Sequence, residues 1–153
     1  MQVLRYAPLR GSAAEVLWRE GEASYVEAGR GRHRAVTDAP LDAEGWCAWL
    51  DGEMAGIQVC RLKPEAREAH GILSWVRPAF RRRGVFGTIQ QQVDADLLAE
   101  GLTHIRSWVV EGPEADAMGA AIIARGGAKV AELPISAVSG PVLYHEYLRP
   151  LRA

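Results

Sequence analysis

Cysteine is scarce in this sequence, and the two that are present do not form a recognisable site. Cys47 and Cys60 have no second cysteine pair or histidine cluster near them, so the spacing of a zinc site is absent and we expect no bound metal. The Asp-Gly pair at residues 51–52 is typical of a two-residue hairpin turn. In that register Cys47 lies opposite Gly56. Cys60 lies opposite Ala43, so the thiols are apart and we expect both to be free and buried.

Long apolar runs and a large net charge are also absent. No run approaches the roughly 18 apolar residues that a membrane-spanning helix needs, and residues 1–10 lack the apolar core of a signal peptide. We therefore expect a cytoplasmic protein without a membrane partner. Lysine and arginine number 18 against 19 aspartate and glutamate, a net charge of -1. The molecule as a whole gives no electrostatic reason to bind nucleic acid, so any anion site must be local.

The overall composition is that of a folded domain. Hydrophobic residues make up 48% and charged residues 24% of the 153 residues, which is not the mixture of a disordered chain. No internal repeat or low-complexity tract divides the sequence, so we expect one domain over residues 1–153.

Apolar periodicity and turn signals predict elements in the order β-α-α-β-β-β-α-β-α-β-β, a mixed α/β sheet. A Ser-x-x-Glu capping box at residues 12–15 begins the first helix, and residues 21–45, the least regular part, would hold a second short one. Pro134 indicates that its strand lies at an edge or is bulged. The expected strands are residues 2–6, 46–50, 54–62, 70–76, 105–110, 130–135 and 142–148. The expected helices are residues 13–20, 24–28, 84–100 and 113–125.

Positive charge is concentrated in one turn. Residues 76–86 read VRPAFRRRGVF: an apolar strand leads in, four arginines fall within seven residues, and a glycine opens the next helix. The first amides of a helix have no internal partner, and the helix dipole adds partial positive charge there. Glycine allows close approach and arginine adds forked donors, so the turn suits a phosphate or pyrophosphate. The Gly-Lys-Ser/Thr of a P-loop and the G-x-G-x-x-G dinucleotide fingerprint are both absent.

This strand, turn and helix resemble the acyl-CoA pyrophosphate loop of the GNAT superfamily of N-acyltransferases, V-x-P-x-[FY]-[RQ]-x-x-G-x-[GA]. The order of elements is similar to that family along most of the chain. The resemblance implies that the strand at residues 70–76 splays from the strand at 105–110, with the pantetheine of the co-substrate acetyl-CoA in the gap. It also implies that the pyrophosphate lies on the amides of residues 82–88, and that the acceptor enters over residues 21–45. The residues that it places at the cofactor are Ser74, Trp75, Val76, Arg81, Arg82, Arg83, Gly84, Val85, Phe86, Gly87, Thr88 and Asp116.

The sequence departs from the family pattern at two places. Phe86 stands where the loop usually has Gly or Ala, although Gly87 follows at once. In the later helix, family members often read N-x-x-A-x-x-x-Y-x-x-x-G-[FY], where the Asn contacts the cofactor and the Tyr protonates the leaving thiolate. Aligned on Gly127, this helix has Asp116 at the Asn and Ile123 at the Tyr. The usual general acid is therefore missing from its usual place.

Glutamate and tyrosine side chains are the candidates for acid–base catalysis. Glu111 ends the strand at 105–110 and falls, by the same alignment, where several family members carry a catalytic carboxylate; a solvated strand-end glutamate is the alternative. Tyr144 and Tyr147 on the last strand could each replace the missing acid, with cross-strand packing as the alternative. Alternation places Tyr147 with His145 on one face and Tyr144 on the other. We assign the catalytic roles to Glu111 and Tyr144.

The reaction that the resemblance implies is transfer of an acetyl group from acetyl-CoA to a primary amine. No Cys or Ser has the setting of a nucleophile, so we expect direct attack in a ternary complex. We expect a small-molecule amine as acceptor; a protein N-terminus or lysine, and a non-catalytic acyl-CoA-binding module, are the alternatives. The GRGRHR stretch at residues 29–34 would be a substrate-side loop whose charge suits an acidic acceptor. A homodimer is left open, and no nucleic-acid partner is expected.

Overall fold

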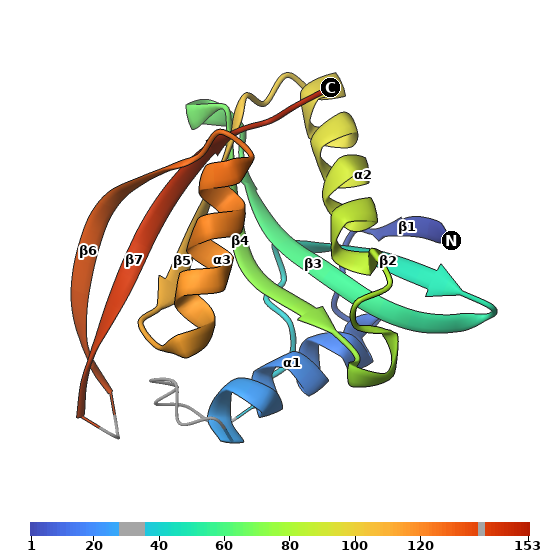
Figure 1. Ribbon diagram of the computed structural model, residues 1–153. Coiled ribbons are helices and arrows are strands. Elements are labelled where there is room, and N and C mark those ends of the chain that lie inside the picture. Colours follow the sequence, from blue (N-terminus) through green and yellow to red (C-terminus); the bar gives the residue numbers. More distant parts are fainter. Residues whose placement is uncertain (28–35, 138–139) are drawn as a thin grey trace.

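The chain forms one mixed sheet with helices packed against it (Figure 1). The computed structural model describes residues 1–27, 36–137 and 140–153. Seven strands lie in the order β1-β2-β3-β4-β5-β7-β6. The strands are β1 (Gln2–Tyr6), β2 (Ala43–Leu50), β3 (Glu53–Lys63), β4 (Glu68–Val76), β5 (His104–Val110), β6 (Ala128–Ala137) and β7 (Gly140–Pro150). The helices are α1 (Glu15–Glu27), α2 (Val85–Ala99) and α3 (Pro113–Ala124). The predicted mixed α/β fold class is confirmed.

The strands β4 and β5 are parallel, whereas the other neighbouring pairs of the sheet are antiparallel. Their pairing runs only from Glu68 opposite His104 to Gly71 opposite Ser107. Beyond that point β4 continues to Val76 and β5 to Val110 without pairing, so the two strands diverge. The splay predicted for this part of the sheet is therefore present, and it opens a wedge in the middle of the sheet.

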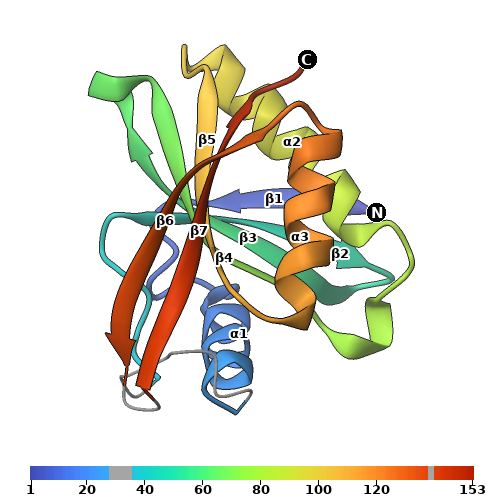
Figure 2. The same cartoon turned by 60° about the vertical axis from the view of Figure 1, so that its left-hand side comes forward.

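Two apolar cores lie on opposite faces of the sheet. The four residues of α2 that recur every fourth position are 0–2% exposed and pack against Trp46, Ala48 and Cys60; they are Val85, Ile89, Val93 and Leu97. The other core gathers α1 residues with Ile57, Val59 and Leu73. Full burial of such a side chain stabilises a fold by about 1.5–3 kcal/mol. The third helix, α3, packs on β5, β6 and β7 (Figure 2). No helix within the described ranges is long and apolar enough to cross a membrane.

The first helix is longer than predicted and passes through Gly21. Residues 13–20 and 24–28 were expected to be separate helices, but α1 is one helix from Glu15 to Glu27, and residue 28 lies outside the described part. A Cβ on Gly21 would lie 2.9 Å from a methyl of Leu73 and 3.1 Å from the Cβ of Trp75. Gly21 is thus required by the close approach of α1 to β4, and does not end the helix.

The predicted capping box forms in a modified way. The Ser12 hydroxyl accepts a hydrogen bond from the Ala14 amide at 3.3 Å. The Glu15 carboxylate accepts from the Gly11 amide at 3.1 Å and from the Ala39 amide at 3.0 Å, so it does not return to Ser12. Glu15 thereby attaches the start of α1 to the segment that leads into β2.

The predicted hairpin turn at residues 51–52 is confirmed, but the predicted register is wrong. Leu50 pairs with Glu53 across the turn, and a bulge then shifts the strands between Ala48 and Trp49. Cys47 therefore lies opposite Ile57, and Cys60 opposite Glu44. Both thiols are free and buried, as predicted. Burial raises the pKa of each thiol to about 12.

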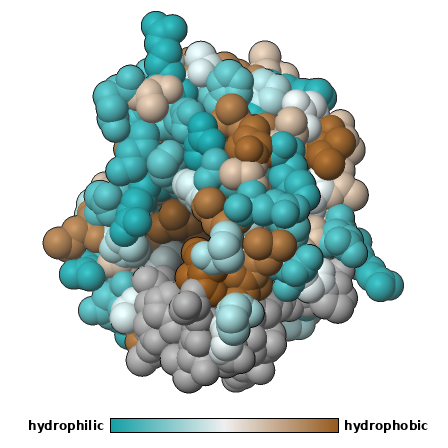
Figure 3. Space-filling view, turned by 90° about the vertical axis from the view of Figure 1, so that its left-hand side faces the viewer, coloured by the Kyte–Doolittle hydropathy of each residue, from teal (hydrophilic) through white to brown (hydrophobic). Residues whose placement is uncertain are grey.

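The last two strands form a hairpin at one end of the sheet. β6 is the edge strand, as Pro134 predicted, and it carries a register shift between Lys129 and Ala131. Figure 3 shows apolar side chains gathered near the centre of the face on which β6 and β7 lie in Figure 1. Among the exposed apolar residues of β6, Leu133 is 37% and Ile135 is 38% exposed. This edge therefore presents apolar surface to solvent.

Candidate active site

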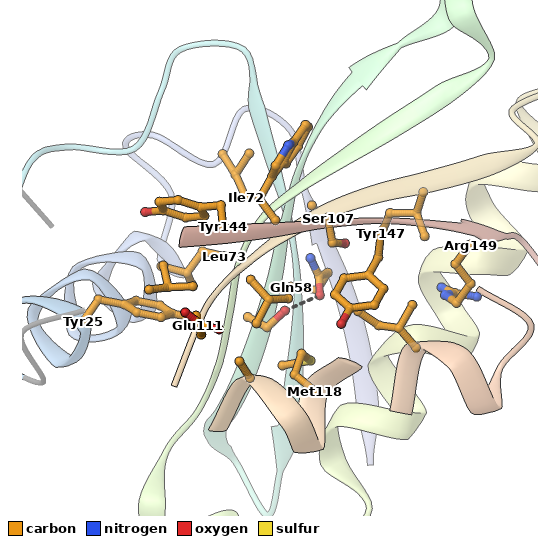
Figure 4. Close-up of a pocket in the computed structure, with 18 of the residues that line it drawn as sticks. Tyr25, Gln58, Ile72, Leu73, Ser107, Glu111, Met118, Tyr144, Tyr147 and Arg149 are labelled. Atoms are coloured by element: carbon orange, nitrogen blue, oxygen red, sulfur yellow. Dashed lines mark hydrogen bonds between the residues drawn. The ribbon is translucent and has the colours of Figure 1, made fainter. Parts of the chain in front are cut away.

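A cavity of about 490 Å³ fills the wedge between β4 and β5 (Figure 4). Its walls come from β3, from both diverging strands, from β7, and from one side each of α1, α2 and α3. The lining includes Tyr25, Gln58, Ser74, Phe86, Ser107, Trp108, Glu111, Ala115, Met118, Ile122, Tyr144, Tyr147 and Arg149. A site of this size and composition, mostly apolar with a few polar groups, is typical of small-molecule binding.

The cavity reaches both faces of the sheet. Ser107 pairs with Tyr147, and Val110 pairs with Tyr144. Because side chains alternate along a strand, the two tyrosines project from opposite faces of β7. In Figure 4 Tyr147 points toward α3, whereas Tyr144 lies on the other side of the β7 ribbon, nearer to Tyr25 of α1. The sequence-based assignment of opposite faces is confirmed, but both tyrosines still line the one cavity.

The strand β4 contributes one predicted cofactor residue to the cavity and directs two elsewhere. The Ser74 hydroxyl lies 2.6 Å from Oε1 of Gln58, a side chain that is only 5% exposed. The Trp75 indole instead packs toward α1 and lies 3.4 Å from Glu20 Oε1. Val76 packs against the α2 core, and its carbonyl accepts a hydrogen bond from Arg81 Nε at 3.1 Å. Only the backbone of Trp75 and Val76 is therefore left to meet a ligand in the wedge.

The turn into α2 exposes backbone amides. Gly84 precedes the helix with φ 75°, and a Cβ at Gly84 or Gly87 would meet no atom within 4 Å. The amides of the first helical turn, up to Gly87, have no intrahelical acceptor. The Thr88 amide does have one, the Gly84 carbonyl at 3.1 Å, and the Thr88 hydroxyl bonds the same oxygen at 2.9 Å. The predicted cradle of amides from 82 to 88 thus ends at Gly87.

The side chains of the predicted loop divide into buried and exposed groups. Val85 is 2% exposed and belongs to the core, whereas Phe86 faces the cavity. Arg81 lies over the Trp75 ring at 5.1 Å and Arg83 over the Phe80 ring at 5.6 Å. Arg82 is exposed with φ 61°. None of these three arginines lines the cavity itself, so they border the amides at its outer end.

Arg77 differs from the other arginines of the motif. Its guanidinium bonds Glu20 of α1 at 2.6 and 2.9 Å and the Met54 carbonyl at 3.1 Å. The hydrogen bond from Arg77 lowers the pKa of Glu20, and the same bond raises the pKa of Arg77. Arg77 is therefore a link between α1 and β4, and its charge is already compensated.

Glu111 lies at the mouth of the cavity, immediately after β5. Its amide donates to the Leu143 carbonyl at 2.8 Å, which fixes the backbone, while the side chain is 64% exposed. The His145 ring lies between two carboxylates, 3.7 Å from Glu111 and 3.6 Å from Glu132. Glu111 is thus placed to meet an acceptor that enters the cavity.

The helix α3 places aliphatic side chains where the family pattern has a tyrosine. Ala115, Met118 and Ile122 line the cavity, whereas Asp116 is exposed and Ile123 is 55% exposed. The cavity-facing isoleucine is therefore one residue earlier than alignment on Gly127 indicates. Asp116 lies outside the cavity lining, and its cofactor contact stays a prediction.

Sequence reasoning missed several cavity residues, among them Gln58, Ser107, Met118 and Arg149. They are far apart in the chain, and no local pattern marks them. Arg149 is 3% exposed and forms a two-pronged ion pair with Asp94 of α2 at 2.7 and 2.8 Å. The stretch at residues 29–34, predicted as a substrate-side loop, lies outside the described residues. Within the described ranges, no three His, Cys, Asp or Glu residues form a group that could hold a metal ion.

The sequence model of the acetyltransferase (GNAT) family matches residues 12–121, and the chain belongs to that family. The family uses acetyl-CoA as acyl donor. A search of curated proteins finds no significant match.

Solved structures of similar fold include acetyltransferases of several kinds. The ribosomal-protein-alanine N-acetyltransferase from Brucella melitensis superposes with a TM-score of 0.72 at 10% identity, covering 99% of this chain and 100% of its own. The IAA acetyltransferase from Bacillus cereus gives 0.67 at 10% identity, covering 98% and 100%. A GNAT family acetyltransferase from Elizabethkingia anophelis with acetyl-CoA bound gives 0.68 at 10% identity, covering 98% and 97%. At these identities the likeness concerns the fold.

Proposed function

We propose that this protein is an N-acetyltransferase that moves the acetyl group of acetyl-CoA to the primary amine of a small molecule by direct attack. The observation that carries the proposal is a cavity that reaches both faces of the sheet and opens beside the free amides of α2. Donor and acceptor can then meet inside the wedge from opposite faces. The volume of about 490 Å³ suits a small acceptor beside the pantetheine arm.

The residues present fit the co-substrate. The exposed amides from Arg82 to Gly87 and the dipole of α2 favour the pyrophosphate, and the open space at Gly84 and Gly87 allows it to approach the backbone. The guanidinium groups of Arg81 and Arg83 stand beside this turn. The unpaired edge of β4 at residues 74–76 faces the wedge, where it can bond the amides of the pantetheine arm.

We assign the role of general base to Glu111. An amine must lose a proton as it attacks a thioester, and a carboxylate at the cavity mouth can accept it directly or through one water. A covalent route through cysteine is disfavoured, because both thiols are buried with pKa values of about 12 and are protonated near neutral pH. Tyr144 was predicted to be the proton donor and stays a candidate, since it lines the cavity.

The class of acceptor, the assembly and the location stay predictions. A protein N-terminus or lysine is the alternative acceptor, and aliphatic Ile122 in α3 is the observation that favours a non-catalytic binder. The exposed apolar residues of β6 offer a surface for the homodimer that the sequence leaves open. We also propose that residues 1–153 act as one domain, because β1 and β7 belong to one sheet. The cytoplasmic location and the lack of nucleic-acid and membrane partners are untested.

The first experiment is thermal unfolding with and without acetyl-CoA, with ATP and NAD as controls. A ligand at about 100 times its Kd adds roughly 2.7 kcal/mol, which raises the midpoint by several degrees in a domain of this size. A shift with acetyl-CoA alone supports the proposal, and no shift contradicts it. Release of free CoA thiol in the presence of small amines, but not of peptides, then supports the small-molecule acceptor.

The substitution Glu111→Gln tests the general base. We expect kcat to fall by about 100-fold, the usual size of a general-base effect, while the Kd for acetyl-CoA stays unchanged. Glu132→Gln is the matched control, because Glu132 also contacts His145 but does not line the cavity. Equal turnover of Glu111→Gln and the wild type would assign the base to another group or to water.

A further inference from the structure

Tyr147 presents its phenol to the cavity. It is 8% exposed and lines the cavity. Its hydroxyl forms no hydrogen bond to another described residue, and it is not one of the fully enclosed polar atoms without a partner, which are Arg125 Nε and His145 Nδ1. A phenol oxygen can donate and accept hydrogen bonds, so this hydroxyl is available to a ligand in the cavity. The hydroxyl of Tyr147 is therefore a donor held ready inside the cavity.

Gly119 in the middle of α3 makes room for this phenol. A Cβ at Gly119 would overlap the Tyr147 hydroxyl, so the phenol oxygen lies against the helix backbone. Glycine in a helix interior is less favourable than alanine. The space that the Tyr147 phenol occupies is a physical reason for a glycine at this position. One turn further along α3, the cavity-facing side chain is Ile122, which has no proton to give.

The position of Tyr147 along β7 matches the apex of the wedge. Tyr147 pairs with Ser107, and Ser107 pairs with Gly71 in the last parallel pair of β4 and β5. The strands separate from this point, so a pantetheine arm that enters along β4 ends here. Tyr144 pairs with Val110, three residues nearer the open end, and projects from the other face. Of the two tyrosines, Tyr147 is on the face of α2 and α3, where we place the donor.

We propose that Tyr147 is the general acid of acetyl transfer, in place of the tyrosine that α3 lacks. This inference rests on the proposed function. The amine nitrogen forms a bond to the acetyl carbon, the bond from that carbon to sulfur breaks, and the sulfur leaves with the electron pair. Tyr147 Oη gives its proton to the sulfur, so CoA departs as a thiol. The amine gives one proton to Glu111, and exchange with water returns Tyr147 and Glu111 to their starting states.

The contact between Tyr147 and sulfur can be measured without knowing the acceptor. We compare the Kd of CoA with that of desulfo-CoA, which lacks the sulfur, in the wild type and in Tyr147→Phe by titration calorimetry. We expect Tyr147→Phe to weaken CoA by about threefold to tenfold, the size of one hydrogen bond, and to leave desulfo-CoA unchanged. Equal losses for both ligands, or no loss for either, would mean that the hydroxyl does not meet the sulfur.

Turnover separates catalysis from binding. With an amine that the wild type acetylates, we expect Tyr147→Phe to lower kcat by about 100-fold or more and to leave KM for acetyl-CoA nearly unchanged. Tyr144→Phe is the comparison: if the loss in kcat falls on Tyr144→Phe instead, the assignment to Tyr147 is wrong. Gly119→Ala is the second variant, since the added methyl displaces the phenol without removing it, and it should lower kcat as well.

The outcomes distinguish this inference from the proposed function. If the wild-type protein neither binds acetyl-CoA nor releases CoA from it, the proposed function is contradicted. The role of Tyr147 as general acid is then contradicted as well. A wild-type enzyme whose kcat is matched by Tyr147→Phe contradicts the role of Tyr147 alone. The thermal midpoint of each folded variant, measured in parallel, shows whether a loss in kcat reflects unfolding.

Discussion

Arginines in two regions of this protein have opposite surroundings. Around the sheet, Arg149 is bound to Asp94, and Arg106 is bound to Glu68 at 2.8 and 2.9 Å and to Glu146 at 2.8 Å. At the start of α2, Arg81 and Arg83 have no carboxylate partner among the described residues and contact only a carbonyl and aromatic rings. The loop at the start of α2 therefore carries positive charge that no carboxylate of the described residues compensates. An anion from outside the protein can bind there without displacing an internal one.

The compensated arginines hold the sheet together next to the wedge. Arg106 of β5 joins Glu68 of β4 to Glu146 of β7, and the Trp108 indole donates to the same Glu146 at 2.7 Å. The hydrogen bond from Arg106 holds the pKa of Glu68 below its usual range, and the same hydrogen bond raises the pKa of Arg106. The ion pair of Arg106 with Glu68 lies where β4 and β5 still pair, whereas Trp108 follows the last residue of that pairing and lines the cavity.

Breaking the buried pair of Asp94 and Arg149 should lower the free energy of unfolding more than any other change considered for these arginines. In Asp94→Asn, Arg149 stays buried with no compensating charge, and such a loss typically destabilises a fold by about 3–5 kcal/mol. Urea unfolding followed by circular dichroism measures the change. Asp116→Asn is the matched control, because Asp116 is an exposed helical aspartate and should have no effect. If the free energy of unfolding fell by less than about 1 kcal/mol, the range of exposed pairs, the buried pair would stabilise the fold no more than a pair on the surface.

A smaller effect is expected at the uncompensated arginines. In Arg81→Ala with Arg83→Ala, we expect the Kd for acetyl-CoA to rise by about tenfold, because charge-assisted contacts to phosphate are lost at a solvated site. S-acetylpantetheine, which lacks the phosphates, should bind both proteins equally. The control is Arg61→Ala, whose exposed guanidinium pairs with Asp42 away from the loop. Equal affinity of the double variant and the wild type for acetyl-CoA contradicts the assigned phosphate site.

The smallest effect concerns the pair of Arg77 and Glu20, which is partly exposed. The pKa of Glu20 is lowered by Arg77, so its contribution is present above the ordinary glutamate pKa of about 4.3 and is lost as the pH falls through the lowered value. Glu20→Gln should therefore cost about 1 kcal/mol at neutral pH, since solvent screens the pair. The difference from the wild type should shrink on acidification. A difference that does not depend on pH would mean that the ion pair is not its cause.

Local patterns predicted most of the fold. The apolar residues of α2 recur at helical spacing, and the Asp-Gly turn marks the hairpin of β2 and β3; both elements are present. Tertiary contacts overrode local signals elsewhere. Glycine often ends a helix, but α1 continues through Gly21, and the missing side chain there leaves room for Leu73 of β4. The bulge after Ala48 has no sequence mark, so the thiol register was one residue out.

The site was predictable only where its residues are close together in the sequence. The glycine after the arginines marks the loop because the loop is continuous in sequence. The cavity is assembled from segments far apart in the chain, such as Gly71 of β4 and Tyr147 of β7. No local pattern distinguishes Arg77, which packs inward, from Arg81, which stays outside. Alternation predicted the faces of Tyr144 and Tyr147, but not that Gly119 leaves room for one of them.

The place of β7 between β5 and β6 bears on how quickly the protein folds. β5 pairs with β4 over only four residue pairs, and along its whole length it is paired by β7, with His104 opposite Pro150. Hairpins such as β2 with β3 and β6 with β7 close short loops, whereas the joint between β5 and β7 encloses all of α3 and β6. Contacts between distant parts of a chain carry a larger loop-closure entropy and slow the search for the native state. The wall that supplies Tyr147 therefore depends on a long-range pairing, as does the joint of β1 with β2, in which Gln2 lies opposite Trp49, whereas the turn from β4 into α2 is continuous in sequence.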